Sequence, residues 1–450
     1  MNTRIYMCSI IFICMYVYIH IYMYMYMYMY MCTYTYTCTH TCICMCIGMT
    51  GSTNKASVEA EQAGVGTNIT MTQPGRATTG GNSRQAMVAD SCGAKSECPS
   101  AGLNAHVTSL DLLIVGFVTC LAVTTNGTWL VCTATALYTV SPNGLLTLLA
   151  GHTSEAGFKD GQGSAARFDS PAAIVVDGAG TMLVADSVNH TLRKVTHTGA
   201  VSTLAGNGQK GYADGVGNAA RFSFPKGIVV GVDGTIYVTD HGNNCVRQVR
   251  PDDGAVSTLA GDGKAGAGFA DGLGLSARFD GPAGLALDTD DHLIVAEINN
   301  SCIRRVTTAE GRVTTVAVSV IGEGFADGKS ATATFHAPMA IAVDGNNNIL
   351  VADFFNNRIQ MVAGAGAHVT TVAGGASGKV DGPGASARFD QPWAVALDEH
   401  GRLLVADNNH SCVRVIEASL APPGQLLAAK VLLLQVCARS PHKQYCACCG

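Results

Sequence analysis

The sequence predicts an all-β fold, a six-bladed β-propeller with four short strands in each blade. The first observation is a repeated motif, seen in residues 268–282 as GFADGLGLSARFDGP. Its phenylalanines are spaced by 54, 57, 56 and 54 residues, at Phe168, Phe222, Phe279, Phe335 and Phe389. A regular interval of about 55 residues indicates a repeated supersecondary unit.

The second observation is the order of short apolar runs inside each repeat. After the proline of the motif come residues 284–288 (GLALD), 293–297 (LIVAE), 302–306 (CIRRV) and 313–317 (VTTVA). Val, Ile and Leu favour strands, and the Gly, Asn and Asp between the runs favour tight turns. Four short strands in each repeat are typical of a propeller blade.

A sixth, divergent copy completes the ring in this interpretation. Five repeats have a second strand that ends in an acid, whereas residues 121–151 keep the hydrophobic pattern but carry Thr133 at that position. The last repeat lacks a clear fourth strand after residues 413–417. We predict that residues 112–117 (LLIVGF) supply it from the N-terminal side. The alternative is residues 426–436 (LLAAKVLLLQV), which could instead form a helix on the rim.

Composition divides the chain into four zones. Residues 1–49 form a low-complexity Met, Tyr, Cys and Thr segment that is long enough to span a bilayer. Its strict alternation also fits an artefact of the gene model, so both interpretations stay open. We expect a disordered linker rich in Gly, Ser, Thr and Ala at 50–106, the propeller at 107–425, and an apolar, then Cys-rich tail at 426–450.

Charge and cysteine usage narrow the function classes. The formal net charge is −5, which disfavours a nucleic-acid partner because such proteins usually carry a basic face. Most of the 18 cysteines lie outside the propeller zone, so no disulfide framework is expected. We expect a protein or a small molecule as partner. A membrane enters only if residues 1–49 are genuine, and the compartment stays undecided.

The strand motifs carry a family resemblance. The pattern P-x-G-I-x-V-D, then L-V-A-D, then N-x-x-[IV]-R, as in residues 225–247 and 392–414, resembles NHL repeats. This resemblance implies a six-bladed propeller that binds partners. It also places the chain near calcium-dependent lactonases and esterases of similar fold. The chain departs from the pattern at Thr133, at Glu297 and at Thr334, which replaces the arginine of the repeated motif.

Residues that recur in every repeat are interpreted as scaffold. A propeller has one axis and needs one site, whereas these groups occur once per blade. We expect the acid that ends the second strand to accept backbone amides across a tight turn. We expect Asp271 and Arg278 to fix the inter-blade linker through an ion pair or through charge-assisted hydrogen bonds, with Phe279 buried between blades. The recurring acids are Asp186, Asp240, Asp353 and Asp407, with Glu297 in one blade.

Residues that differ between repeats are the candidates for function. The position after the proline varies and lies at the start of the innermost strand, on the face where the inter-blade linkers emerge. There Lys226, Met339 and Trp393 are candidate binding residues, and His336 joins them from the linker. As a metal alternative, Asp169, Asp280 and Asp390 could ring the channel and hold calcium.

The sequence therefore favours a non-catalytic binding scaffold that uses the linker-loop face. The alternative is a calcium-dependent hydrolase of the lactonase type, with one ion on the propeller axis. We favour the non-enzyme interpretation because no Ser, His and Asp can be assigned to a triad from their spacing. No cofactor is expected, and calcium is the one that the alternative would require.

Overall fold

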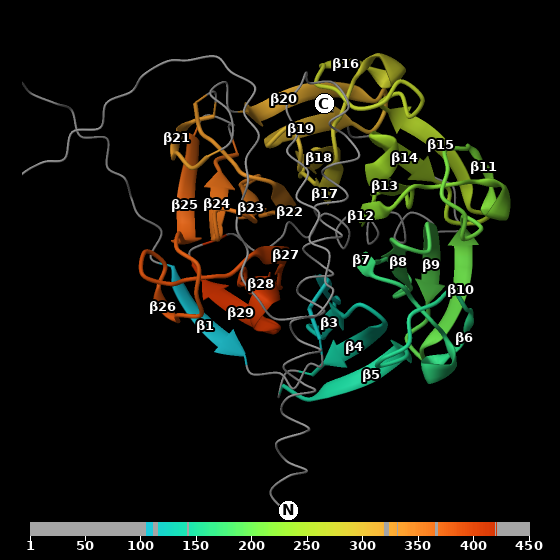
Figure 1. Cartoon of the computed structure of the whole chain (residues 1–450), viewed down its shortest axis with the longest axis horizontal. Helices are drawn as coiled ribbons and strands as arrows, with labels where there is room; N and C mark the ends of the chain where they lie inside the picture. The colour runs from blue at the N-terminus through green and yellow to red at the C-terminus, as the bar shows by residue number, and fades with distance from the viewer. Residues whose placement is uncertain are drawn as a thin grey trace, which may run out of the picture. The chain divides into compact units, whose positions relative to one another are not determined.

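The computed structural model describes residues 105–110, 116–141, 144–318, 324–330, 332–364, 368–418 and 420. Within them, six β-sheets stand around a common axis (Figure 1), which confirms the predicted six-bladed propeller. The predicted zones at residues 1–49 and 426–450 lie outside the described residues, as does most of the linker at 50–106.

Each blade is an antiparallel sheet whose strands follow the chain outward from the axis. The first three blades contain β2 (Cys120–Val123), β3 (Trp129–Cys132), β4 (Ala136–Val140) and β5 (Leu146–Gly151); β7 (Pro171–Val176), β8 (Met182–Asp186), β9 (Thr191–Val195) and β10 (Ala200–Ala205); and β12 (Pro225–Val230), β13 (Ile236–Asp240), β14 (Cys245–Val249) and β15 (Ala255–Ala260).

The remaining blades follow the same plan. They contain β17 (Pro282–Leu287), β18 (His292–Glu297), β19 (Cys302–Thr307) and β20 (Arg312–Val318); β22 (Pro338–Val343), β23 (Ile349–Asp353), β24 (Arg358–Val362) and β25 (His368–Gly374); and β27 (Pro392–Leu397), β28 (Leu403–Asp407), β29 (Cys412–Glu417) and β1 (His106–Leu110).

The ring is closed by β1, which comes from the N-terminal side of the propeller. It pairs antiparallel with β29, with Val107 opposite Ile416, and becomes the fourth strand of the last blade. The predicted direction of closure is confirmed, but the predicted segment, residues 112–117, is wrong. The less apolar residues His106–Leu110 form the strand instead, because Val107 is fully buried among residues of the last two blades. The rival segment at 426–436 lies outside the described residues.

The repeated motif, which precedes five of the six inner strands, forms the joint between blades. The glycine of its DG pair begins a two-residue strand that pairs with the outer strand of the same blade, and a short 3-10 turn follows in three of the joints. The added strands are β6 (Gly161–Gln162), β11 (Gly215–Val216), β16 (Gly272–Leu273), β21 (Gly328–Lys329) and β26 (Gly382–Pro383), and the turns are η1 (Gly163–Ala165), η2 (Gly217–Ala219) and η4 (Gly274–Ser276).

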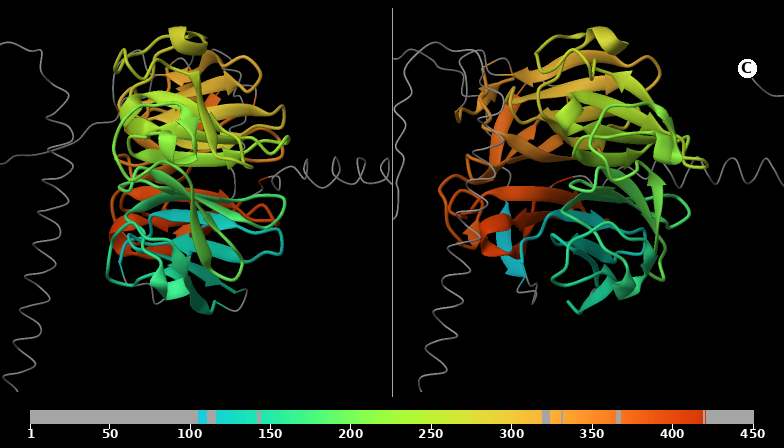
Figure 2. Two further views of the ribbon diagram at one scale, coloured as in Figure 1. Left: turned by 90° about the vertical axis from the view of Figure 1, so that its right-hand side faces the viewer. Right: turned by 45° about the vertical axis from the view of Figure 1, so that its right-hand side comes forward.

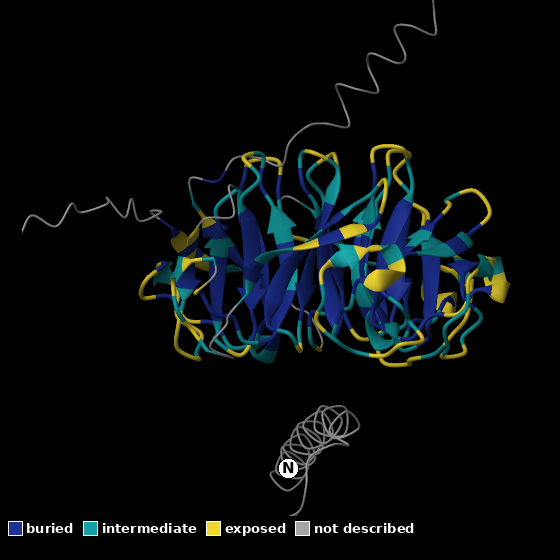
Figure 3. Ribbon diagram, turned by 90° about the horizontal axis from the view of Figure 1, so that it is seen from above, coloured by how far each residue is buried: buried dark blue, intermediate teal, exposed yellow. Residues whose placement is uncertain are grey.

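The core lies between the blades rather than inside any one of them. All five motif phenylalanines have no exposed surface, and Phe168 packs with Leu137 of the first blade and Ile174 of the second. The middle strands are covered on both faces by neighbouring blades, which is why a run such as MLVAD is buried throughout instead of alternating. The strands run between the two faces of the disc (Figure 2), and exposed residues collect on the turns (Figure 3).

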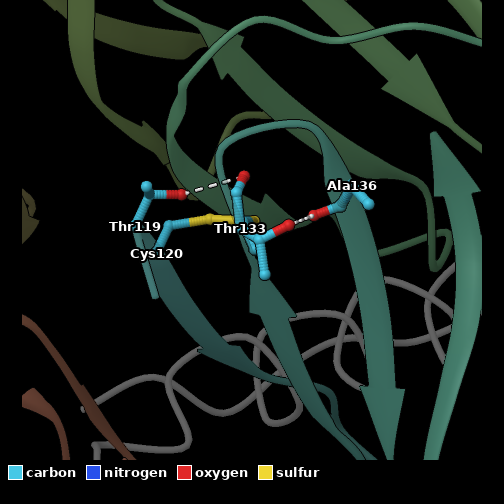
Figure 4. The surroundings of a disulfide bond; sticks show 5 residues. Thr119, Cys120, Thr133 and Ala136 are labelled. Carbon is cyan, nitrogen blue, oxygen red and sulfur yellow. Dashed lines mark hydrogen bonds between the residues drawn. A yellow bond between two sulfur atoms is a disulfide. The ribbon is translucent and has the colours of Figure 1, made fainter. Parts of the chain in front are cut away.

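The first blade differs from the others in two ways. Among the described residues its sheet has four strands instead of five, and Cys120 of β2 forms a disulfide with Cys132 of β3 (Figure 4). The two cysteines lie directly opposite each other, where Ala173 and Ala185 pair in the second blade. Thr133 replaces the usual acid, and its hydroxyl donates to the carbonyl of Ala136.

Candidate functional site

The acids that end the second strands are buried and belong to the scaffold. One carboxylate oxygen of Asp186 accepts the backbone N–H of Asp169, and the other accepts the side-chain N–H of Asn189. The acid therefore has the predicted structural role, but it binds a different backbone amide from the one expected. The backbone amide comes from the residue two positions before the inner strand rather than from the adjacent turn, so the acid ties the second strand to the inter-blade linker.

A buried arginine of the third strand completes this network. In the fourth blade Arg304 forms ion pairs with Glu297 at 2.6 Å and with Asp271 at 2.7 Å. Its guanidinium also lies 4.9 Å from the ring centroid of Phe269 and 5.4 Å from that of Phe279. Each such arginine is thus held by two carboxylates and, in three blades, by two aromatic rings. The equivalent residues are Arg193, Arg247 and Arg414.

Asp271 and Arg278 do not form an ion pair with each other, and each makes the predicted alternative, charge-assisted hydrogen bonds, with other partners. The Asp271 carboxylate binds Arg304 and also accepts the backbone N–H and the hydroxyl of Thr315. Arg278 donates instead to the carbonyl of Ala265 in its own loop. The third-strand arginine takes the Asp because it is fully buried and needs two carboxylates, whereas Arg278 stays near water. The burial of Phe279 is as predicted.

The fifth blade lacks this arginine. Gln360 occupies its position and donates to Asp327 at 3.3 Å, while Arg358 lies over the ring of Phe325. Asp353 still accepts the side-chain N–H of Asn356 and the backbone N–H of His336. Burial raises the pKa of Asp353 to about 7. Among the five blades that keep the acid, the scaffold network is therefore weakest in this one.

A cavity of about 380 Å³ occupies the propeller axis. It is lined by the six inner strands β2, β7, β12, β17, β22 and β27, each of which contacts its two neighbours around the ring. Among the described residues that line it, Lys226 has the only charged side chain, and the rest are apolar residues, glycines and Cys120. The side chains that line the site are therefore apolar except for one cation.

Lys226 and Trp393 meet across the mouth of this channel. Their inner strands, β12 and β27, lie on opposite sides of the ring, three blades apart in either direction. The Lys226 ammonium lies 5.7 Å from the centroid of the Trp393 ring, within the range of a cation–π contact. Burial lowers the pKa of Lys226 to about 8. Burial and the charge of Lys226 also lower the pKa of the neighbouring His241 to about 3, which leaves its imidazole neutral.

An aromatic row runs outward from Trp393. The ring of Trp393 meets Phe354 edge-on with centroids 5.6 Å apart, Phe354 meets Phe355 at 4.8 Å, and Phe355 meets His336 at 4.8 Å. Of the four predicted binding residues, Lys226, Met339 and Trp393 thus line the cavity, whereas His336 does not. His336 forms the outer end of the row instead.

The proposed calcium ring of Asp169, Asp280 and Asp390 does not form. Asp280 accepts the side-chain N–H of Asn299, and Asp390 that of Asn409, so these carboxylates bind the turn that follows the second strand of their blade. Within the described ranges, only one group of three His, Cys, Asp or Glu side chains is close enough to share a metal ion, and it is Asp288, Asp290 and His292. Asp288 there accepts the turn amides of residues 290 and 292.

Sequence reasoning missed several parts of this site. The third-strand arginine could have been found, since it recurs seven residues after the acid in N-x-x-[IV]-R. The Cys120 to Cys132 disulfide was visible as two cysteines at paired Ala positions of the divergent copy. Phe354, Phe355 and His241 gave no signal because they occur in single blades. No helix among the described residues is long and apolar enough to cross a membrane.

Comparison with known proteins agrees with this architecture. The family model described as NHL repeat matches residues 222–249 and 389–416, which cover parts of the third and sixth blades. The chain thus contains NHL repeats within a six-bladed β-propeller. The buried Phe222, Asp240 and Arg247 of one matched segment, and Phe389, Asp407 and Arg414 of the other, belong to the network described above.

Several proteins share the NHL-repeat region. The chain is 27% identical over 296 residues to Protein SUPPRESSOR OF QUENCHING 1, chloroplastic, from Arabidopsis thaliana, covering 62% of this chain and 28% of that protein. It is 28% identical over 295 residues to NHL repeat-containing protein 2 from Homo sapiens, covering 58% and 40%. The chain thus spans less than half the length of the curated relatives it matches.

Among solved structures, the propeller resembles an auxiliary nutrient binding protein from Bacteroides thetaiotaomicron VPI-5482. The TM-score is 0.54 at 13% identity, and the match covers 70% of this chain and 77% of that one. At this identity the likeness shows the fold alone.

Proposed function

We propose that this NHL-repeat propeller is a non-catalytic binding scaffold whose linker-loop face recognises a protein or a small ligand. The observation that carries the proposal is the convergence of Lys226, Met339 and Trp393 at the mouth of the axial cavity. These are positions at which the repeats differ, on a frame that otherwise repeats. A rigid frame with variable residues at one end is suited to selective binding.

The aromatic row supports the same face as a contact surface. Trp393, Phe354, Phe355 and His336 come from two adjacent blades and lie in mutual contact, and Phe355 is 36% exposed. Aromatic residues are enriched in binding interfaces, and a buried Trp at the centre of a contact is a frequent hot spot. Phe354, which is 1% exposed, holds the Trp393 ring in place, so little order has to be gained on binding.

The calcium-dependent hydrolase receives less support. An axial calcium ion needs several oxygen ligands. Among the described residues, the side chains that line the axial cavity contribute no carboxylate, amide or hydroxyl group. Two of the three aspartates considered for this role, Asp280 and Asp390, accept hydrogen bonds from asparagine side chains instead.

Variants of the face test the proposal. Trp393→Ala and Lys226→Met in the full chain should lose partners that the unaltered chain retains, as measured by quantitative mass spectrometry of captured proteins and metabolites. Val232→Ala is the matched control, because Val232 is exposed and follows the far end of the same strand β12. If all three variants capture the same set as the unaltered chain, the binding surface is elsewhere.

A further inference from the structure

We propose that the axial cavity binds a small monocarboxylic acid with an apolar body, whose carboxylate pairs with Lys226 and whose body enters the channel. This inference rests on the proposed binding function and specifies the ligand class of the same site. It follows from the cavity's lining, its single charge and the contact that crosses its mouth.

The lining selects an apolar body. Inner-strand residues such as Ile174, Leu285 and Ile341 line the cavity from different blades, and among the described lining residues no side chain other than that of Lys226 carries a charge or a hydroxyl, amide or carboxylate group. A cavity of about 380 Å³ lies in the range of small-molecule sites and is too narrow for a folded partner to enter. Burial of a hydrocarbon body there gains roughly 25 cal/mol for each Å² removed from water.

The single charge selects an anion. Among the described residues no acidic side chain pairs with Lys226, and its ammonium faces the Trp393 ring and the neutral imidazole of His241. A partly desolvated ammonium without a counter-ion is costly, and a ligand carboxylate would relieve that cost. A dianion or a phosphate would bring more charge than one lysine balances, so a monocarboxylate fits best.

The contact across the mouth defines how the ligand enters. Lys226 and Trp393 approach from opposite blades, so their cation–π contact crosses the channel at the linker-loop face. An entering acid must separate the two side chains. A carboxylate replaces the cation–π contact that Lys226 loses, because a charge-assisted hydrogen bond is stronger than a cation–π contact at such a site. A neutral ligand cannot form this charge-assisted hydrogen bond with Lys226.

The test uses 3-phenylpropanoate and its uncharged analogue 3-phenylpropanamide with the full chain, followed by calorimetry and by tryptophan fluorescence. We expect saturable binding of the acid, a change in Trp393 fluorescence that persists in Trp129→Phe, and affinity for the amide lower by at least about tenfold. Lys226→Met should remove the preference for the acid, whereas Lys226→Arg and Val232→Ala should retain it.

Three results would overturn the inference. They are equal affinity for acid and amide, an unchanged preference in Lys226→Met, and absence of saturable binding. Tighter binding of acetyl-Ala-Ala-Phe with a free carboxylate than of 3-phenylpropanoate would also overturn it, since the occupant would then be a chain terminus. If the acid fails to bind while Trp393→Ala still loses captured partners, the proposed function stands without this ligand class. If both fail, neither proposal holds.

Discussion

The joints between the blades use the same residues in several blades, whereas the mouth of the axial cavity has a different residue in almost every blade. In four joints a third-strand arginine is held by two acids beside the motif phenylalanine, as Arg247 is held by Asp240 and Asp214. At the mouth, equivalent positions carry Ala172, Lys226, Ala283, Met339 and Trp393, no two large residues alike. Repetition accompanies a shared structural task, and variation accompanies a site that exists once. The difference identifies where binding chemistry is to be sought.

The largest expected effect concerns the joint that closes the ring. Val107→Asp places a charge at a fully buried position of β1, between the last two blades. We expect a loss of about 4 kcal/mol or more in the free energy of unfolding, since an unpaired buried charge costs several kcal/mol. Thr108→Asp is the matched control on the exposed face of the same strand. Equal denaturation midpoints for the two variants would show that β1 does not close the ring.

The next effect separates the two arginines of the repeat. Arg247→Met leaves the buried Asp240 without its cation, and we expect a loss of about 3 to 5 kcal/mol in chemical denaturation. Arg221→Met alters the arginine of the repeated motif in the same blade and should cost less than about 1 kcal/mol. A larger loss for Arg221→Met would reverse the assignment of which arginine holds the joint.

An effect that is smaller at any one pH unit and depends on pH is expected in the fifth blade, where the joint lacks its arginine. The folded-state pKa of Asp353 is about 7, above the ordinary value of 3.8, so its contribution to stability is full below pH 4 and is lost as the pH rises through 7. Relative to Asp353→Asn, the unaltered chain should lose stability between pH 4 and 7, by at most about 1.4 kcal/mol per pH unit. Denaturation at several pH values measures this difference.

A constant difference between Asp353→Asn and the unaltered chain over that range would contradict the account of the fifth blade. It would mean that Arg358, although it makes no ion pair with Asp353 at hydrogen-bond distance among the described contacts, balances the buried acid as well as Arg247 balances Asp240.

Most of the fold was predictable because the same order of strands and turns recurs in the sequence of every blade. Six copies of the same strand order indicated a six-bladed propeller, and the motif phenylalanines indicated where the blades join. The closing strand was predicted at the wrong segment because residues 112–117 are more apolar than His106–Leu110. In the structure, pairing with β29 and the burial of Val107 identify His106–Leu110 as the closing strand. Hydrophobicity alone does not report register.

The site was predictable only in part. Lys226, Met339 and Trp393 were found because they vary at one known position of the repeat. Their meeting across the axis depends on the number of blades, which places β12 opposite β27, and on side-chain reach. The pairing of Asp271 with Arg304 rather than Arg278 was missed because the two partners lie 33 residues apart, and spacing in the sequence favoured the nearer arginine.

The contrast between joint and mouth is tested most directly by measuring the free energy of unfolding and the affinity for 3-phenylpropanoate of Lys226→Met beside Arg247→Met. Lys226→Met removes a charge from an apolar cavity, so we predict stability equal to or above that of the unaltered chain and affinity reduced by at least about tenfold. Arg247→Met should lose stability while its folded fraction binds normally. A Lys226→Met chain that is destabilised as much as Arg247→Met and binds the acid unchanged would contradict the account.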